Sequence, residues 1–399
     1  MYTDYRKLRK VGYELVDVNI VQAPISFINH RKECNPYTTI ANQHVFPVIV
    51  SPMASVTDEN NWKTWLDAGF MSVVPRTVDF TKRMELCHKV FVSVSLDEAE
   101  GLLLSEDFAN AMNCEETHFS YICIDIAHGT MNRLYQVCKD LKKAFGTQVV
   151  IMTGNIANPD AYPFYAQAGI DYVRLSVGSG SRCTTSCNVG VHYPVATLID
   201  ETNHQRLKWL ETHDGPAPKL IMDGGISNFD DIQKALALGA DFVMCGNLFA
   251  RAEEACGNVG YMHPDNLNMT DAIPENVYIE KVNGLEATLK YMIQDYEKYR
   301  TEIAQVNESL AKMRKRKPYR EYYGMSTKKA QIATGSCGNK TSEGISRPIP
   351  VEYPIAKWAD NMKSYLLSAM SYVDAKNLKE LRENTELIIN LSGDGAFRK

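Results

Sequence analysis

Short apolar runs recur through the first 250 residues of the chain. Each run is continuous rather than alternating and is rich in β-branched residues, which is typical of a strand covered on both faces. Eight such runs are present, at residues 46–51, 70–74, 91–95, 121–126, 148–152, 171–176, 219–222 and 241–245. The pattern therefore predicts eight buried strands.

Segments long enough for one helix separate most of these runs. They include residues 58–68, 132–145, 160–168 and 228–238. The last three end at Gly146, Gly169 and Gly239, where glycine can adopt the left-handed conformation that stops a helix. Strand and helix alternating eight times predict an α/β fold, a (β/α)8 TIM barrel, with an open doubly wound sheet as the alternative.

Residues 256–318 do not follow the barrel pattern. Apolar residues there have a four-three spacing over about four heptads, which predicts a coiled-coil helix over 285–313. They are Leu285, Leu289, Met292, Tyr296, Tyr299, Ile303, Val306, Leu310 and Met313. A single helix this polar cannot bury its seam alone, so we expect it to pair with a neighbouring subunit, another protein or the outer surface of the barrel.

The pattern predicts three parts of the chain. Residues 1–255 form the barrel core, and 256–318 are an inserted, coiled-coil-like helical segment. Residues 319–399 carry a glycine- and serine-rich stretch typical of a mobile flap, followed by C-terminal helices that complete the barrel domain.

Composition excludes several classes of protein. The net charge of −5 and the lack of a basic stripe disfavour nucleic-acid binding. The N-terminus has no apolar signal core and no run of about 18 apolar residues occurs, so we expect a soluble cytoplasmic protein without a membrane span. The ten cysteines form no C-x-x-C pair, which indicates reduced thiols rather than a zinc or redox motif.

Three chemically suggestive turns follow the last three predicted strands. Gly178-Ser-Gly-Ser-Arg-Cys-Thr-Thr185 follows the sixth, Asp223-Gly-Gly-Ile226 the seventh and Cys245-Gly-Asn247 the eighth. In a barrel these turns share one rim, where active sites lie. Cys183 in a loop with exposed amides suits a nucleophile that acts on a phosphorylated substrate, although a lone cysteine is more commonly a small buried apolar residue.

These motifs resemble the IMP dehydrogenase and GMP reductase family. Thr184-Thr185 and Gly190-Val-His-Tyr-Pro194 are similar to the reductase branch in particular, and Tyr323-Gly-Met-Ser326 to the family's base-contacting segment. The resemblance implies chemistry at C2 of a purine nucleotide through a covalent bond to Cys183. A thiolate is the reactive form, and nearby amides lower its pKa.

The resemblance also implies roles for individual residues. Thr185 and Glu343 would handle protons beside Cys183 as ammonia leaves. Asp223 would accept hydrogen bonds from both ribose hydroxyls. The implied substrate contacts are Ser181, Asp223, Gly224, Gly225, Gly246, Asn247, Tyr323, Gly324, Met325, Ser326, Lys340 and Gly344.

A nicotinamide cofactor and a cation are further implications of the resemblance. The implied cofactor contacts are Ser26, Arg76, Asp125, Ala127, Val177 and Gly178, with Ser26 reaching the cofactor of a neighbouring subunit. Carbonyl oxygens of Gly178, Gly180 and Cys183 are similar to a potassium site in relatives, and carbonyls suit such a hard cation.

The flap favours the reductase over the dehydrogenase. In the dehydrogenase branch the resemblance implies a long flap that carries an Arg-Tyr pair. The corresponding segment here, residues 325–343, is short and contains no arginine, and Lys340 stands where a flap arginine is usual. The implied reaction is GMP plus NADPH giving IMP, ammonia and NADP, in a homotetramer whose extra helices pair between subunits or tetramers.

Departures from the family pattern leave alternatives open. Ala54 replaces a usual acidic residue, and Val74-Pro75-Arg76 stands where a His-Lys pair is common. A modified purine, or NADH in place of NADPH, is compatible with these changes. The competing functions are IMP dehydrogenase, converting IMP to XMP with NAD, and a catalytically silent purine nucleotide-binding protein that recruits a partner through its coiled coil.

Overall fold

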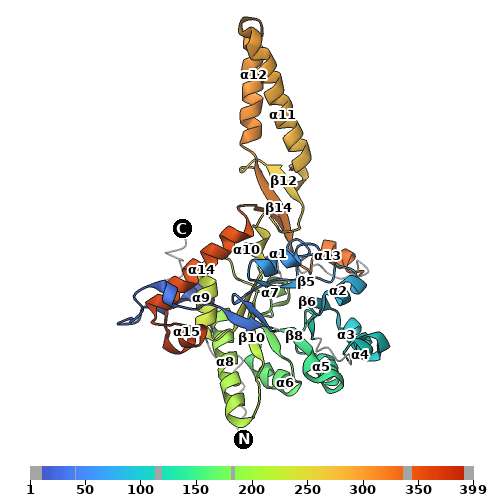
Figure 1. Cartoon of the computed structure of the whole chain (residues 1–399), viewed down its shortest axis with the longest axis vertical. Helices are drawn as coiled ribbons and strands as arrows, with labels where there is room; N and C mark the ends of the chain where they lie inside the picture. The colour runs from blue at the N-terminus through green and yellow to red at the C-terminus, as the bar shows by residue number, and fades with distance from the viewer. Residues whose placement is uncertain (1–10, 41, 113–118, 181–184, 336–343, 391–399) are drawn as a thin grey trace.

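A closed barrel of eight parallel strands forms the centre of the molecule (Figure 1). The computed structural model describes residues 11–40, 42–112, 119–180, 185–335 and 344–390. The strands are β4 (Val48–Val50), β5 (Met71–Val74), β6 (Phe91–Val94), β7 (Ser120–Asp125), β8 (Val149–Ile156), β9 (Tyr172–Leu175), β10 (Lys219–Asp223) and β11 (Phe242–Cys245). They follow chain order and β11 pairs with β4, so the predicted barrel is confirmed and the open sheet is excluded.

Helices link successive strands on the outside of the barrel. They are α1 (Trp62–Asp67), α2 (Phe80–Leu86), α3 (Leu96–Leu104), α4 (Glu106–Met112), α5 (Asn132–Phe145), α6 (Tyr162–Gln167), α7 (Thr185–Val189), α8 (Val195–Thr212), α9 (Phe229–Leu238) and α10 (Asn247–Ala250). Gly146, Gly169 and Gly239 have φ values of 57°, 74° and 125°. The three predicted helix stops therefore coincide with positive-φ glycines.

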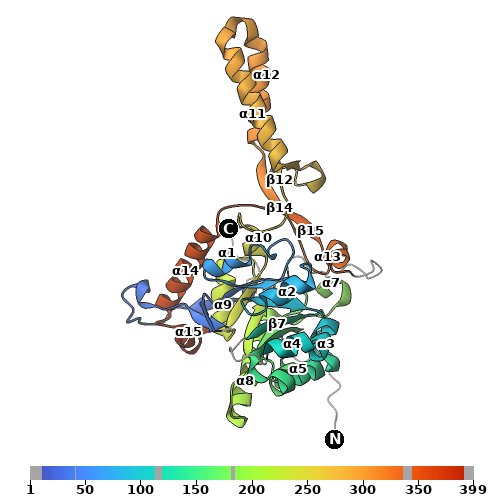
Figure 2. The same cartoon turned by 45° about the vertical axis from the view of Figure 1, so that its right-hand side comes forward.

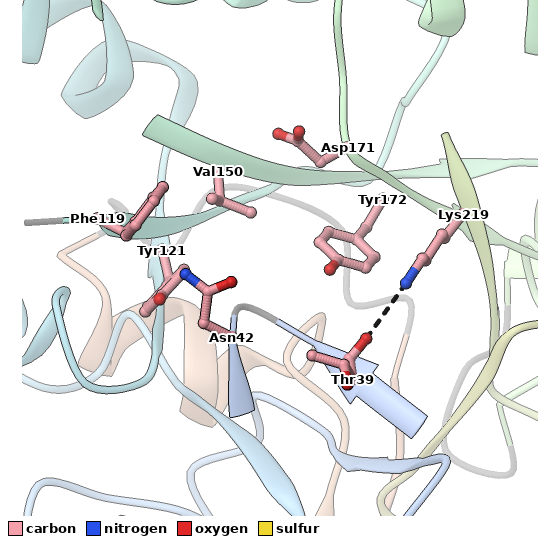
Figure 3. A pocket seen from close by; sticks show the side chains of 8 residues that line it. All are labelled: Thr39, Asn42, Phe119, Tyr121, Val150, Asp171, Tyr172 and Lys219. Carbon is pink, nitrogen blue, oxygen red and sulfur yellow. Dashed lines mark hydrogen bonds between the residues drawn. The ribbon is translucent and has the colours of Figure 1, made fainter. Parts of the chain in front are cut away.

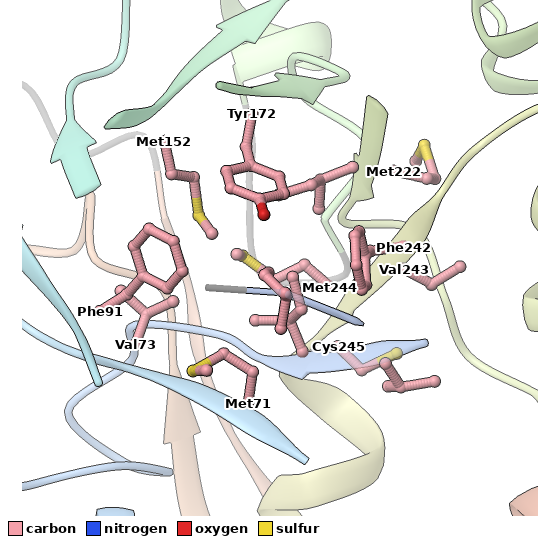
Figure 4. Packing of buried hydrophobic residues seen from close by; sticks show 14 of the residues in the cluster. Met71, Val73, Phe91, Met152, Tyr172, Met222, Phe242, Val243, Met244 and Cys245 are labelled. Carbon is pink, nitrogen blue, oxygen red and sulfur yellow. The ribbon is translucent and has the colours of Figure 1, made fainter. Parts of the chain in front are cut away.

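Large side chains fill the barrel, so it is a packed core and not a channel (Figure 4). The rings of Phe91 and Tyr172 lie 5.8 Å apart, and Tyr172 lies 6.0 Å from the ring of Phe242, both in edge-to-face geometry. Met152 and Met244 are fully buried in the same cluster. This rigid interior holds the strand ends, and the loops that leave them, in place.

The N-terminal end of the barrel is covered by a hairpin of β2 (Thr38–Ile40) and β3 (Gln43–Val45). A cavity of about 240 Å³ lies there (Figure 3). Its lining is Thr39, Asn42, Phe119, Tyr121, Val150, Asp171, Tyr172 and Lys219. Several of these begin barrel strands, so the cavity faces away from the rim where catalytic loops lie.

The two ends of the described chain meet beside the barrel. β1 (Val18–Val21) pairs antiparallel with β16 (Glu386–Ile389). The long helix α14 (Ile355–Tyr372) and the short α15 (Leu378–Asn384) pack against α9. One face of α14 is buried, with Trp358, Met362, Leu366 and Met370 no more than 2% exposed.

A helical arm projects from the barrel after α10 (Figures 1 and 2). Its root is a sheet of β13 (Ile273–Pro274), β12 (Val259–Met262), β14 (Lys317–Tyr323) and β15 (Ser346–Pro350), in that order. The arm itself consists of α11 (Glu275–Met292) and α12 (Tyr296–Arg314), joined by a short 3-10 turn η6 (Ile293–Asp295). At 1.5 Å per residue α11 is about 27 Å long, and α12 is interrupted near its start by Tyr299, whose φ and ψ of −111° and 19° are not helical.

The single coiled-coil helix predicted over 285–313 is wrong. The chain reverses at η6, and α11 and α12 run side by side as an antiparallel pair. Arg314 pairs with Glu286 at 2.8 Å near the root, and the rings of Tyr291 and Tyr299 lie 6.0 Å apart near the tip. A heptad pattern does not distinguish one long helix from two antiparallel helices, and the turn contains no glycine or proline to mark it.

The seam thus finds its partner within the same chain. Ile303 and Leu310 of α12 are buried, while Leu285 and Leu289 of α11 are half-buried. The requirement for a partner outside the chain, which motivated pairing between subunits, therefore falls away. Of the helices in the described ranges, none combines the length and apolarity needed to cross a membrane.

Candidate active site

A buried arginine organises the C-terminal rim of the barrel. Arg174 lies on β9 and is 6% exposed. Its guanidinium donates from Nη1 to Asp125 at 2.8 Å and from Nη2 and Nε to Asp223 at 2.8 and 3.0 Å. Asp125 ends β7 and Asp223 ends β10, so one guanidinium joins the ends of three strands.

Charge balance determines the ionisation of Asp125. Burial opposes ionisation, but the guanidinium groups of Arg174 and Arg76 outweigh it, so the pKa of this carboxyl lies below its usual value. Burial disfavours the charged form of Arg174 too, but the two neighbouring carboxylates raise its pKa well above the usual value. The three groups therefore form a charged cluster inside the rim.

Asp223 is held in one orientation by two donors. Besides Arg174, the Nδ2 of Asn155 at the end of β8 donates to it at 2.9 Å. All of these bonds end on Oδ2, so within the described ranges Oδ1 is the oxygen left to receive donors from a ligand.

Two glycine turns pack directly on each other beside Asp223. Gly224 and Gly225 have φ values of 88° and 75°, which favour glycine. A Cβ at Gly224 would lie 3.2 Å from the amide nitrogen of Gly180, and one at Gly225 would lie 3.3 Å from the Ser179 side chain. The turns after β9 and β10 thus come together as the sequence predicts.

The third turn follows β11 and is covered by side chains of Met53 and of Tyr322 from the arm root. A Cβ at Gly246 would lie 2.5 Å from Met53 Sδ and 2.6 Å from the Tyr322 hydroxyl. Gly246 immediately precedes α10, whose first residue is Asn247. A side chain at this position would have to displace the Met53 thioether and the Tyr322 hydroxyl.

The predicted base-contacting segment forms a capped turn between β14 and α13 (Lys328–Ala333). Thr327 donates from Oγ1 to the Gly324 carbonyl at 2.8 Å and accepts from the Ala330 amide at 3.3 Å. A Cβ at Gly344 would lie 2.8 Å from Ser326 Oγ. The segment 324–326 and the end of the predicted flap are therefore brought into contact.

Comparison with known proteins agrees with this geometry. Residues 12–270 match the model of the IMP dehydrogenase / GMP reductase domain. The chain belongs to the IMP dehydrogenase / GMP reductase family. This match covers all eight barrel strands and the turns that follow them.

Relatives from both branches of the family resemble the chain. It is 27% identical over 352 residues to the GMP reductase of Vibrio vulnificus (strain YJ016), covering 86% of this chain and 82% of the relative. It is 30% identical over 237 residues to the GMP reductase of Enterococcus faecalis, with coverage of 58% and 69%. The inosine-5'-monophosphate dehydrogenase of Chlorobaculum parvum is 29% identical over 273 residues, with coverage of 68% and 46%.

The cofactor residues implied by the family resemblance are only partly brought together. Arg76 follows β5, and its Nε lies 3.8 Å from Asp125 Oδ2. Its buried Nε has no hydrogen-bond partner in the described part of the chain. Ala127 is exposed after β7, and Val177 and Gly178 follow β9. These side chains and turns lie on the rim.

Ser26 is not part of this rim cluster. Its hydroxyl donates to the Ser371 carbonyl at 2.9 Å and lies 3.2 Å from Asp374 Oδ1, beside the C-terminal end of α14. Its neighbours Ile25 and Phe27 are 63% and 71% exposed. The contacts of Ser26 within its own chain therefore do not involve the site, and the predicted contact with a neighbouring subunit's cofactor stays a prediction.

Several predicted residues of this family member lie outside the described ranges. They are Ser181, Cys183, Lys340 and Glu343. Thr185 begins α7, which places the end of the cysteine loop directly beside the rim. The catalytic roles of Cys183, Thr185 and Glu343 accordingly stay predictions.

The potassium prediction involves the same loop. The Gly178 carbonyl accepts from Ser186 Oγ at 3.0 Å, and a carbonyl keeps a second lone pair for a cation. Gly180 lies two residues further along the same loop, whereas Cys183 lies outside the described ranges. The part of the chain that the structure describes holds no cluster of three or more His, Cys, Asp or Glu suited to a metal.

Sequence reasoning missed Arg174 and Asn155. Arg174 interrupts the apolar run 171–176, and a charged residue inside a buried strand needs a partner, which was the available signal. Asn155 follows the predicted end of the fifth strand at 152, whereas β8 continues to Ile156. Both contact Asp223, which the sequence did identify.

Proposed function

We propose that the chain is a GMP reductase, which converts GMP to IMP and ammonia with NADPH as the reductant. The observation that carries the proposal is the fixed orientation of Asp223, held by Arg174 and Asn155 beside two packed glycine turns in a protein of this family. A carboxylate beside close-packed turn amides suits a ribose with its 5'-phosphate. The reductase branch is supported by Thr185, Glu343 and the short flap.

The chemistry proceeds in two balanced steps. In the first, Cys183 Sγ bonds to C2 of the purine, and the 2-amino group leaves as ammonia after receiving a proton through Thr185 and Glu343. NADPH would supply, when bound, the hydride for C2, and cleavage of the bond between C2 and Cys183 Sγ would then release IMP and the thiolate. Tyr323, Gly324, Met325 and Ser326 hold the base, with Lys340 and Gly344 from the flap.

We assign the phosphate and cofactor contacts to residues on the C-terminal rim of the barrel. Amides of Gly224, Gly225, Gly246 and Asn247, with the hydroxyl of Ser181, hold the 5'-phosphate. Arg76 fits an anionic group because its Nε is buried without a hydrogen-bond partner in the described ranges. Asp125, Ala127, Val177 and Gly178 hold the nicotinamide end, and the carbonyls of Gly178, Gly180 and Cys183 hold potassium. NADH is the alternative reductant.

A paired assay tests this proposal. We expect ammonia release and loss of NADPH absorbance with GMP, and no formation of reduced nicotinamide with IMP and NAD. Turnover with IMP and NAD alone would instead identify an IMP dehydrogenase. Purine nucleotide binding with neither reaction would identify a silent nucleotide-binding protein.

The proposed assembly is a homotetramer formed through the barrels. Ile25 and Phe27 are exposed apolar side chains on either side of Ser26, and an apolar surface of this kind suits contact with a neighbouring subunit. Such a contact would bring Ser26 to the neighbour's cofactor.

Deleting the arm is expected to leave this assembly unchanged. Because α11 and α12 pair with each other, replacement of Glu275–Arg314 by a short glycine-serine linker removes a self-contained unit. Light scattering coupled to size exclusion checks the expected result, which is the same number of subunits and a smaller mass. Dissociation of the truncated protein would show that the arms hold subunits together.

A further inference from the structure

β14 connects the arm to the nucleotide site. The strand starts at Lys317, directly after α12, and ends at Tyr323, where the base-contacting segment begins. It pairs with β12 on one side and β15 on the other. Its position therefore determines where the segment 323–326 lies relative to the barrel.

Arg320, in the middle of β14, is bound to the backbone that leaves the barrel. It is 2% exposed. Its Nη1 donates to the carbonyls of Ala250 and Ala252 at 2.7 and 2.5 Å, its Nη2 to Glu253 at 3.1 Å, and its Nε to Gly257 at 3.1 Å. One side chain thus satisfies four carbonyls around the end of α10.

A second residue on the same face of β14 reaches the other end of α10. Tyr322 is 4% exposed, and its hydroxyl donates to Met53 Sδ at 3.3 Å. The same hydroxyl closes over Gly246, as the 2.6 Å distance to a Cβ at that position shows. Residues two apart on a strand share a face, so Arg320 and Tyr322 together hold α10 at both ends.

Arginine suits this position because of its shape. Its planar fork carries five N–H donors, and a lysine ammonium has only three on a flexible stem. No carboxylate of the described ranges lies within ion-pair distance of Arg320, so its contacts orient backbone and do not neutralise an acid. The carbonyls at the end of α10 are the acceptors that a helix leaves unpaired.

We infer that Arg320 is a positioning residue that sets the spacing between the two halves of the nucleotide site. The base half is the segment 323–326 at the end of β14, and the phosphate half comprises the turns at 224–225 and 246–247. Arg320 touches neither half and acts by locking β14 to the chain that follows β11. The inference rests on the proposed function, because that function assigns the two halves to one ligand.

The test compares a nucleotide with its nucleoside. Both ligands engage the base half and can place their ribose on Asp223, but only GMP engages the phosphate turns, so an altered spacing between the base half and those turns weakens GMP much more than guanosine. In Arg320→Lys we expect the affinity for GMP by calorimetry to fall about tenfold or more and the affinity for guanosine to stay within about twofold. In turnover, KM for GMP should rise by a similar factor while kcat changes less than about threefold.

Arg316→Lys is the matched control. Arg316 lies directly before β14 in the chain. Its Nη1 donates to the Tyr261 carbonyl at 3.1 Å, within the arm root and away from α10. It should bind GMP as the wild type does. Arg320→Met, which removes the guanidinium donor from all four carbonyls, gives the upper limit of the effect if its thermal unfolding shows that it folds.

The outcomes separate the inference from the proposed function. Equal GMP affinity in Arg320→Lys and wild type overturns the inference alone. An equal loss of GMP and guanosine binding also overturns it, because a general loosening of the site does not discriminate between the two ligands. A wild type that binds no GMP overturns the proposed function and the inference with it.

Discussion

Replacement of Cys183 by alanine is expected to lower turnover of GMP by at least about 10⁴-fold. In the proposed mechanism the thiolate forms the bond that lets ammonia leave, so its loss removes the covalent route. Binding of GMP should stay within about threefold of wild type, because the ribose and phosphate contacts do not depend on the sulfur. Steady-state rates of ammonia release and calorimetry with GMP measure the two quantities.

Cys187 provides the matched control for this experiment. It is an exposed thiol on α7, four residues after Cys183. Cys187→Ala should retain turnover within about twofold, since surface substitutions rarely disturb a site. Full activity of Cys183→Ala would eliminate covalent catalysis, and an inactive Cys187→Ala would move the nucleophile to α7.

Replacement of Arg174 by methionine is expected to destabilise the protein by about 3–5 kcal/mol, because it removes the counter-ion that two buried carboxylates share and leaves Asp125 only the more distant Arg76. Asp125 and Asp223 are 14% and 12% exposed, so water does not replace the lost guanidinium. Nucleotide binding should weaken as well, because Asp223 loses both bonds from Arg174 and keeps only the one from Asn155. Urea unfolding at pH 7 measures the free energy.

The pH dependence has a definite sign. In the wild type the pKa of Asp125 is lowered, so its ion pair stabilises the fold above the unfolded-state pKa of about 4 and this contribution is lost as pH falls. The cost of Arg174→Met should therefore be smaller at about pH 3 than at pH 7. A cost that does not change with pH would contradict the ionic role.

Arg133→Met is the control for burial. Arg133 also pairs with two acids, Asp97 and Glu100, each at 2.5 Å, but it is 52% exposed. Exposed pairs contribute little to stability because water screens them, so Arg133→Met should cost much less than Arg174→Met. Equal costs for the two variants would show that burial of the Arg174 cluster does not matter.

The barrel could be predicted from the sequence because the patterns that specify its strands and helix ends each extend over only a few neighbouring residues. Runs such as 91–95 and 241–245 are continuous and apolar, which only doubly covered strands require, and glycines such as Gly146 mark helix ends. The three rim turns follow from the same regularity, since the carboxyl ends of parallel strands meet at one rim. Asp223 and the glycine turns therefore lie together as expected.

The path of the chain through the arm could not be predicted from local sequence patterns. The four-three spacing over 285–313 is compatible with one helix or two, and the choice depends on whether the chain reverses at η6. Burial decides it, because a reversal lets the seam of α12 pack against α11 without a second chain. The spacing alone carries no such information.

The sequence by itself determined the eight strands, their order and the rim on which Asp223 and the glycine turns meet, because periodicity and glycine stops act over a few residues. Tertiary structure alone decided that Arg174 joins Asp125 to Asp223, that α11 and α12 pair with each other, and that Arg320 reaches back to α10. The Arg174 bonds join residues 49 positions apart, the Arg314–Glu286 pair spans 28 positions and the Arg320–Ala250 bond spans 70. Side chains so distant in the chain meet only when the barrel has closed.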